Sequence, residues 1–216
     1  MSAPRSTQAT IDPDAVRAAL VRCRRIVERH ADWLTRLDAV LGDGDHGDNL
    51  VIGFRAVEAL LDDLPPETRP GELLQAVGHR LVAAVGGASG PLYGTAFLEA
   101  GAAADDRETL DGAVLVEMLD AAAAGLARRG RCAVGDKTIL DALAPAAATF
   151  RRSIADGMPP ASAFPAGLRA GASGARTSRA LVARRGLALR LGPRSAGHLD
   201  PGAVSCVLLL RALGGR

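Results

Sequence analysis

The stretch that decides the fold is residues 37–50, which read LDAVLGDGDHGDNL. An apolar helical repeat ends in it, a glycine-rich break follows at residues 42–47, and another apolar repeat begins at Leu50. Asp38, Asp43 and Asp45 gather at this break. Three carboxylates this close repel one another unless a cation lies between them, and hard divalent ions take oxygen ligands. The stretch predicts two helices joined by a Mg²⁺ site, and the alternative is a solvated acidic turn that caps the second helix.

Two known motifs share letters with this loop but do not fit it. Residues 42–47 match the GxGxxG of dinucleotide-binding folds, which needs a preceding strand, whereas a helix is predicted here. Asp43 and Asp45 begin like an EF-hand, but its twelfth position is Phe54, where a bidentate Glu is required.

Apolar residues recur at helical spacing on both sides of the break, and no segment shows convincing strand alternation. We expect eight helices, over about residues 12–41, 50–64, 70–85, 91–104, 109–129, 138–154, 160–185 and 201–213. Residues 186–199 are expected to return irregularly to the last helix. The fold class predicted is therefore all-α, with a flexible N-terminus at residues 1–11 and one domain over residues 12–216.

Composition supports the helical reading and excludes several functions. Only six of the 216 residues are aromatic and alanine is abundant, which favours packed helices over a β-sandwich. A net charge of +2 predicts no nucleic-acid partner, and no apolar run is long enough to predict a membrane span. The three cysteines form no CxxC pair, so we expect core thiols in a reduced, cytoplasmic protein.

The basic residues are unusual, because the chain has a single lysine, Lys137, among 26 basic side chains. Coding bias explains the scarcity of lysine elsewhere. The position of Lys137, in a loop before a predicted helix, favours a local structural role in which it fixes the loop through a neighbouring carboxylate, Asp136 or Asp141. The alternative is an ordinary surface charge.

Three further glycine-rich loops join predicted helices, at residues 86–94, 130–138 and 197–202. The first allows close backbone approach to a ligand, and N–H groups at the start of the next helix can hold phosphate. The second resembles a P-loop, but Asp136 intrudes before Lys137 and no strand precedes it. In the third, Asp200 is most simply an N-cap and His198 a structural histidine. We expect the four loops to lie together at one end of a helical bundle, where they would form a binding site for a metal ion and a nucleotide.

Taken together, four strings resemble the motifs of the dihydroxyacetone kinase L subunit family (DhaL), which is also the C-terminal nucleotide domain of single-chain dihydroxyacetone kinases. They are LDAVLGDGDHGDNL, GGASGPLYGT, GDKTILDALAPA and GPRSAGHLDPGAVS, in the family's order. The resemblance implies an eight-helix antiparallel barrel whose loops at one end bind ADP or ATP through two Mg²⁺ ions.

The resemblance also implies a role for individual residues. The metal ligands would be Asp38, Asp43 and Asp45. The nucleotide would be bound along its phosphates and sugar by His46, Gly47, Asp48 and Asn49, at phosphate by Ala88 and Ser89, beside adenine by Gly130 and Ile139, and on the far side by Asp200, Pro201 and Gly202.

In this family the L subunit acts with a partner, because dihydroxyacetone is held on a separate K subunit, so the resemblance implies that the chain is a kinase subunit that needs a partner. In one branch ADP stays bound and is re-phosphorylated by a phosphotransferase-system M protein, and in the other ATP is exchanged. A kinase subunit for another small ketose or sugar alcohol, and a non-catalytic nucleotide-bearing regulator, are the alternatives. A homodimer is compatible with all of them.

The sequence departs from the family in two places. The family usually has GRASY before its last loop, and its arginine contacts the nucleotide, whereas residues 186–190 here read GLALR. Leu187 therefore replaces the arginine and Arg190 the tyrosine, and leucine cannot donate a charge-assisted hydrogen bond. Asp48 adds a negative charge where the family usually has an uncharged residue. Both changes bear on nucleotide affinity and on the choice of substrate partner.

Overall fold

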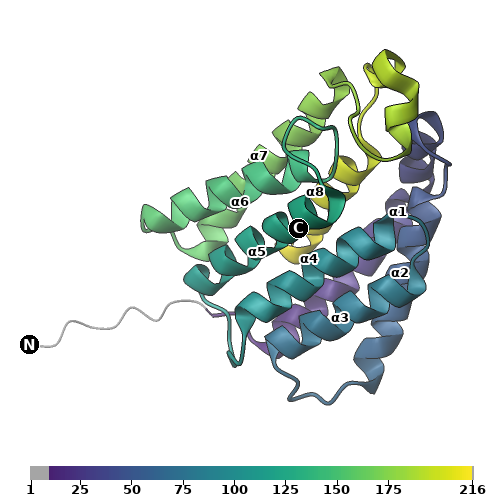
Figure 1. The fold of residues 1–216 in the computed structure, drawn as a ribbon. Helices are drawn as coiled ribbons and strands as arrows, with labels where there is room; N and C mark the ends of the chain where they lie inside the picture. The colour runs from purple at the N-terminus through teal and green to yellow at the C-terminus, as the bar shows by residue number, and fades with distance from the viewer. Residues whose placement is uncertain (1–9, 216) are drawn as a thin grey trace, which may run out of the picture.

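The computed structural model describes residues 10–215, and these form helices joined by short loops (Figure 1). The α-helices are α1 (Pro13–Leu41), α2 (His46–Asp63), α3 (Pro70–Ala84), α4 (Ser89–Ala104), α5 (Gly112–Gly130), α6 (Leu140–Ala155), α7 (Pro160–Thr177) and α8 (Pro201–Leu213). Two 3-10 segments, η1 (Ser178–Ala180) and η2 (Leu187–Ser195), lie between α7 and α8. Within residues 10–215 the extended pairing is one isolated bridge, Ile11 with Leu110, so the all-α prediction is confirmed.

The N-terminus is described only in part. Residues 1–9 of the predicted flexible segment lie outside the described residues. Ile11 exchanges two backbone hydrogen bonds of 2.8 Å with Leu110, in the loop between α4 and α5.

The helices form a closed antiparallel ring. Each helix contacts the next along the chain, and α8 returns to contact α1. Because neighbouring helices run in opposite directions, the odd-numbered helices end where the even-numbered ones begin. The connections at residues 42–45, 85–88, 131–139 and 178–200 therefore share one end of the ring, which we call the loop end (Figure 1).

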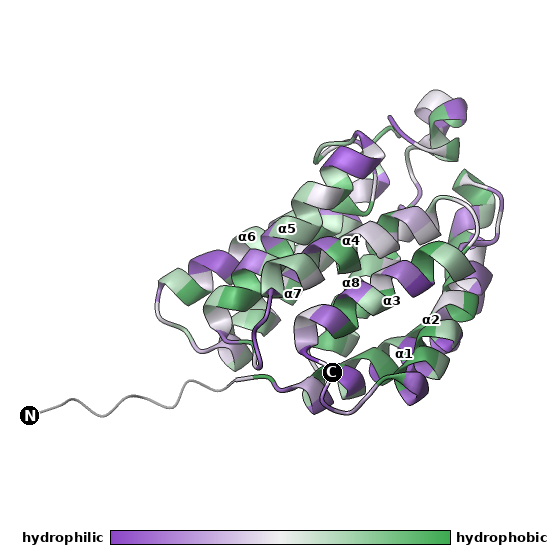
Figure 2. Cartoon of the chain, turned by 60° about the horizontal axis from the view of Figure 1, so that its bottom comes forward, coloured by the Kyte–Doolittle hydropathy of each residue, from purple (hydrophilic) through white to green (hydrophobic). Residues whose placement is uncertain are grey.

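The inside of the ring is apolar. Hydrophobic and hydrophilic residues form separate stripes along the helices, as expected for helices with one buried face (Figure 2). The core includes residues of all eight helices, and Phe54, Leu73 and Leu126 are completely buried in it. Two of its aromatic rings, Phe54 and Phe97, meet edge to face.

Small residues allow the helices to approach closely, which explains how a chain with few aromatics fills its core. Between α3 and α4, Gly78 lies against Gly94, and Gly71 lies against Gly101. A Cβ on Gly78 would lie 2.8 Å from the Gly94 carbonyl oxygen and 2.6 Å from Leu98 Cγ. Real Cβ atoms do not approach so closely, so glycine sets the distance between these two helices.

Several predicted helix boundaries were wrong. Helix α2 begins at His46 rather than Leu50, and α4 begins at Ser89 rather than Pro91. Helix α7 ends at Thr177 rather than residue 185, because buried Ser178 donates to the Ala175 carbonyl and accepts from the Asp200 N–H. The irregular return contains the 3-10 segment η2, which is broken at Gly192, where φ is 53°.

Substituting Gly78→Ala should lower the free energy of unfolding by about 1–3 kcal/mol, because the added methyl group forces α3 and α4 apart. Urea denaturation measures this. Ala83→Ser, on the exposed face of the same helix, is the control and should change stability by less than about 0.5 kcal/mol. Equal stability of the two variants would contradict the close approach of α3 and α4.

Candidate metal and nucleotide site

The three predicted metal ligands meet at the loop end. Asp38 lies in the last turn of α1, and Asp43 and Asp45 lie in the loop before α2. Each offers a carboxylate oxygen, and these atoms all lie within 4.8 Å of one another. Among the described residues none of the three forms an ion pair with a basic side chain. The cluster is therefore a set of oxygen donors with uncompensated negative charge.

Asp38 organises this loop. Its Oδ2 accepts hydrogen bonds from the backbone N–H groups of Gly44, Asp45 and His46, at 3.0, 3.1 and 3.3 Å. Two glycines make this geometry accessible. A Cβ on Gly42 would collide with Asp38 Oδ1, and Gly44 has a φ of 78°, which favours glycine.

The electrostatics of the cluster fit a divalent cation. Burial raises the pKa of Asp45, the nearby Asp43 and Asp38 carboxylates raise it further, and the Asn49 side chain opposes the shift. A cation bound between carboxylates offsets their mutual repulsion and favours their charged form. Mg²⁺ takes oxygen ligands and is usually held by carboxylates together with water and substrate phosphates, so the residues present fit this ion.

The residues predicted to bind the nucleotide lie at the first turns of the four even-numbered helices, with Gly130 at the end of α5. His46, Gly47, Asp48 and Asn49 begin α2, Ala88 and Ser89 begin α4, Ile139 precedes α6, and Asp200, Pro201 and Gly202 begin α8. Helix N-termini carry free N–H groups and a positive partial charge, which favour phosphate. The ring fold thus gathers four such termini at one end.

Several of these residues are close in space. A Cβ on Gly86 would lie 3.4 Å from Asn49 Oδ1, and a Cβ on Gly202 would lie 3.5 Å from the Ile139 nitrogen. Gly47 does not lie against another predicted nucleotide-binding residue in this way. The position that a Cβ would take at Gly47 is occupied by the Ala31 carbonyl and by Thr35 Oγ1, both of α1. Gly47 allows α1 and α2 to approach each other.

His46 joins three helices through its imidazole. Its Nδ1 lies 2.9 Å from Ser89 Oγ in α4, and its Nε2 lies 2.8 Å from Ser205 Oγ in α8. Ser205 Oγ is also 2.7 Å from the Tyr93 hydroxyl and donates to the Gly202 carbonyl at 3.1 Å. Burial lowers the pKa of His46, which favours the neutral ring. Because Ser205 donates to Gly202, it accepts a hydrogen bond from His46. The neutral ring that satisfies every partner therefore carries its proton on Nε2, and its Nδ1 accepts from the Ser89 hydroxyl.

Sequence reasoning assigned no role to Tyr93 or Ser205. Both lie inside the quoted strings GGASGPLYGT and GPRSAGHLDPGAVS, but no local spacing connects them to His46. With both ring nitrogens engaged, His46 holds the starts of α2 and α4 against α8. Its place along the phosphates remains a prediction.

The expectation that Lys137 pairs with a carboxylate or lies on the surface was wrong. Its side chain is buried, and Nζ donates to the carbonyl of Ser178, at 2.6 Å, and to the carbonyl of His198. Burial lowers the pKa of Lys137, and the negative charges of Asp200 and Asp141 oppose the shift. Lys137 therefore has a structural role, as the sequence suggested, but its partners are backbone carbonyls of the connection between α7 and α8 rather than a carboxylate.

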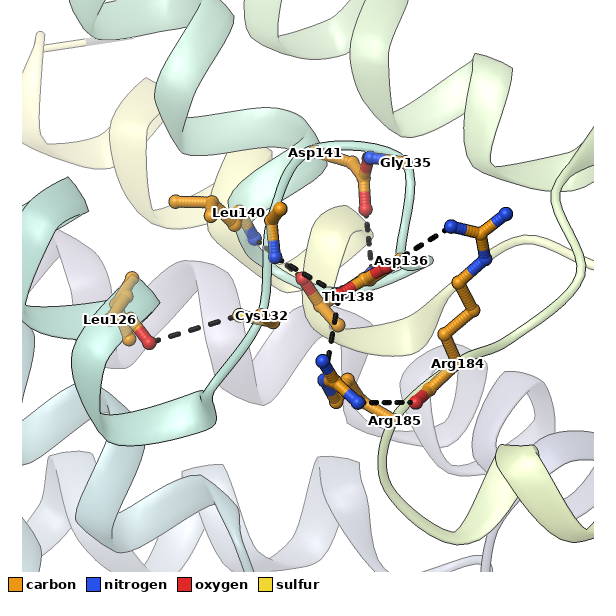
Figure 3. A network of polar contacts seen from close by, with 10 residues as sticks. Leu126, Cys132, Gly135, Asp136, Thr138, Leu140, Asp141, Arg184 and Arg185 are labelled. Carbon is orange, nitrogen blue, oxygen red and sulfur yellow. Dashed lines mark hydrogen bonds and ion pairs between the residues drawn. The ribbon is translucent and has the colours of Figure 1, made fainter.

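The neighbouring carboxylates have other partners, as Figure 3 shows. Asp136 lies 3.5 Å from Arg185 Nε and 3.9 Å from Arg184 Nη1, and it accepts from the Ala133 N–H. Asp141 accepts from the N–H groups of Gly135 and Thr138, at 2.6 and 2.7 Å. Asp141 therefore closes the loop before α6.

Asp200 caps α8 as the sequence predicts, by accepting from the Ala203 N–H at 2.7 Å. Burial raises its pKa to about 7, although the Ala203 hydrogen bond and the Lys137 charge oppose this shift. Leu187 and Arg190, which replace two residues of the family's GRASY string, are both exposed on η2.

Ser205→Ala should lower the free energy of unfolding by about 1–3 kcal/mol, because it leaves His46 Nε2 and the Tyr93 hydroxyl buried without their serine partner. Tyr93→Phe is the matched control, because it removes one hydroxyl and leaves Ser205 with His46 and Gly202. We expect it to cost only about 0.5–1.5 kcal/mol. Urea denaturation compares the two variants. An equal or larger effect of Tyr93→Phe would contradict a central place for Ser205 in the hydrogen bonds that join His46 and Tyr93.

Asp200→Asn should change how stability depends on pH. A carboxyl whose folded pKa is raised stabilises the fold fully below its unfolded pKa, and this contribution is lost as pH rises through its folded value, here about 7. Asparagine retains the cap but does not titrate. The stability of Asp200→Asn relative to wild type should therefore rise between about pH 4 and pH 8, in urea denaturation without divalent cations. A constant difference would mean that folding does not raise the pKa of Asp200.

The comparisons with known proteins agree with this geometry. Residues 40–215 match the DAK2 domain family. The chain is 41% identical over 193 residues to the ADP-binding subunit DhaL of PEP-dependent dihydroxyacetone kinase 2 from Listeria innocua, covering 87% of each chain. It is 35% identical to L-erythrulose 1-kinase from Mycolicibacterium smegmatis, over 84% of this chain and 32% of that enzyme.

A solved structure shares the fold. The dihydroxyacetone kinase of C. freundii, in complex with AMP-PNP and Mg²⁺, matches 99% of this chain with a TM-score of 0.73 and 25% identity. This chain corresponds to 36% of that protein's length. Among residues 10–215, no helix is both long and apolar enough to cross a membrane. By sequence and by fold, the chain belongs to the DAK2 domain family.

Proposed function

We propose that this chain is the Mg²⁺- and adenine-nucleotide-binding subunit of a dihydroxyacetone kinase, which passes a phosphoryl group to dihydroxyacetone held on a separate K subunit. The observation that carries the proposal is the cluster of Asp38, Asp43 and Asp45 beside four helix N-termini. The relatives that share this architecture are named as ADP-binding kinase subunits and as kinases. The three free cysteines fit a reducing, cytoplasmic setting.

The division of labour follows from the chemistry of phosphoryl transfer, which needs positioning and charge neutralisation more than a protein nucleophile. Asp38, Asp43 and Asp45 would hold Mg²⁺, which supplies neutralisation of the phosphate charge. Two ions would suit a cluster of three carboxylates that combines the exposed Asp43 with the less exposed Asp38 and Asp45.

The remaining residues would orient the nucleotide. The first turns of α2 and α4 would offer the N–H groups of Asp48, Ala88 and Ser89 toward phosphates. Asn49, whose N–H donates to the Asp45 carbonyl, would contribute its side chain. The hydrogen bonds of the His46 ring with Ser89 and Ser205 hold these two turns at a fixed separation. Gly130 and Ile139 would border the adenine, and the start of α8, Asp200 to Gly202, would close the far side.

Two phosphoryl donors are compatible with this proposal. A phosphotransferase-system M protein would re-phosphorylate bound ADP, or free ATP would exchange. The name of the L. innocua relative, a PEP-dependent kinase subunit that covers the same length, favours the first source.

A second candidate is a kinase subunit for another small ketose. The similarity to L-erythrulose 1-kinase supports it, since that enzyme contains a region alike in sequence over 84% of this chain. In either case the substrate would be chosen by the partner subunit and the nucleotide by this one.

The test of the proposal is calorimetry with ADP. Wild type should bind ADP with Mg²⁺ present, and Asp43→Asn/Asp45→Asn should bind it at least roughly 100-fold more weakly, because the ion loses its ligands. With dihydroxyacetone-loaded K subunit and a phosphoryl donor, wild type should also form phosphorylated product.

Asp62→Asn, at the other end of α2, is the control for charge and should bind ADP as wild type does. Melting temperatures of all three proteins separate loss of the site from loss of the fold. Undiminished ADP affinity in the double variant would refute the assignment of the metal site. Binding without any transfer would instead indicate the regulatory subunit.

A further inference from the structure

Residues 176–199, which we call the arginine segment, have an unusual charge. The segment carries six arginines, and no aspartate, glutamate or lysine. All six are exposed: Arg176, Arg179, Arg184, Arg185, Arg190 and Arg194. None of the chain's 24 acidic residues lies here, so the rest of the chain has an excess of acidic side chains. The positive charge is thus concentrated in one connection at the loop end.

Two buried polar side chains anchor the segment to the loop before α6. Lys137 Nζ donates to the carbonyls of Ser178 and His198, near the two ends of the segment. Asp136 pairs with Arg184 and Arg185 in its middle, and its carbonyl accepts from the Arg184 N–H at 3.0 Å (Figure 3). The segment is therefore attached to the barrel at both ends and at its centre.

Internal hydrogen bonds also close the segment on itself. Buried Ser195 Oγ accepts from the Ala183 N–H at 2.8 Å and donates to the Gly192 carbonyl at 2.7 Å. Gly197 N–H donates to the Arg179 carbonyl at 2.7 Å, and Arg179 Nε donates back to the Gly197 carbonyl at 2.8 Å. A surface held in this way loses little conformational entropy when it binds a partner.

Apolar side chains are exposed among these arginines. Val182, Leu187 and Leu189 are 42%, 40% and 54% exposed, and Val134 of the neighbouring loop is 62% exposed. Segment η2 also contacts α1, whose last turn exposes Val40. Exposed apolar groups beside arginines, at the mouth of a site, are typical of protein interfaces.

We propose that the arginine segment is the docking surface for the substrate-bearing partner subunit, and that the partner meets it with an acidic face that has an apolar centre. The inference rests on the proposed function, which requires a second protein at this end of the barrel. Arginines that extend over 19 residues, from Arg176 to Arg194, present a charged surface rather than a point contact for one phosphate. Exposed leucines have no use in binding phosphate but bury well against another protein.

Charge complementarity of this kind acts mainly on the rate of encounter. The double variant Arg176→Glu/Arg194→Glu tests it, because neither arginine has an ion-pair partner among the described residues and neither is assigned to the nucleotide. We expect its association rate with dihydroxyacetone-loaded K subunit to fall about 10- to 100-fold at low salt. Its KM for K subunit should rise by a similar factor, with kcat at saturation and ADP affinity unchanged.

The matched control is Arg107→Glu/Arg152→Glu, which makes the same change of charge at the opposite end of the barrel. Leu189→Asp tests the apolar part and should raise the KM for K subunit without changing ADP affinity. The wild-type association rate should fall steeply with added salt, and that of the arginine double variant should depend on salt much less.

The outcomes separate this inference from the proposed function. If wild type transfers phosphate and the arginine double variant matches its control in KM and association rate, the docking surface is wrong although the function stands. If the variant loses ADP affinity instead, the segment belongs to the nucleotide site. If wild type self-associates through this face in sedimentation and the variant does not, the occupant is a second copy. If wild type neither binds ADP nor transfers phosphate, the proposed function fails, and the inference fails with it.

Discussion

The carboxylate of Asp38 accepts hydrogen bonds from three successive backbone N–H groups, and the rest of the loop end depends on this interaction. It stops α1 and α2 from merging and sets the first residue of α2. That position directs the imidazole of His46 between Ser89 and Ser205, which in turn places the starts of α4 and α8. One buried acidic side chain thus serves both as a structural cap and as a candidate metal ligand.

The loop end has opposite charges on its two sides. The carboxylates of Asp38, Asp43 and Asp45 lie where α1 passes into α2, and six exposed arginines lie from the last turn of α7 through the connection to α8. Both sides are supported by buried polar groups, because Asp38 holds the first and Lys137 with Asp136 holds the second. A buried polar group is costly without partners, and in both loops these groups have hydrogen-bond or ion-pair partners.

Much of the fold and of the metal site could be predicted from the sequence. All eight α-helices were expected, because their apolar periodicity and their glycine and proline boundaries are local signals. The end of α7 was misplaced because Ser178 and Asp200, whose hydrogen bond helps to end the helix, are 22 residues apart. Lys137 was misassigned for a similar reason, since its two carbonyl partners lie 41 and 61 residues along the chain.

By itself the sequence determined the helices, the glycine breaks and the carboxylates that gather in residues 37–50, because helical spacing and acidic loops concern residues close together in the chain. Only the tertiary structure decided the surroundings of His46, whose partners Ser89 and Ser205 are 43 and 159 residues away. It also decided that the arginine segment lies at the same end as the carboxylates. The physical reason is the closure of the ring, which brings α8 back to α1 and places four distant connections together.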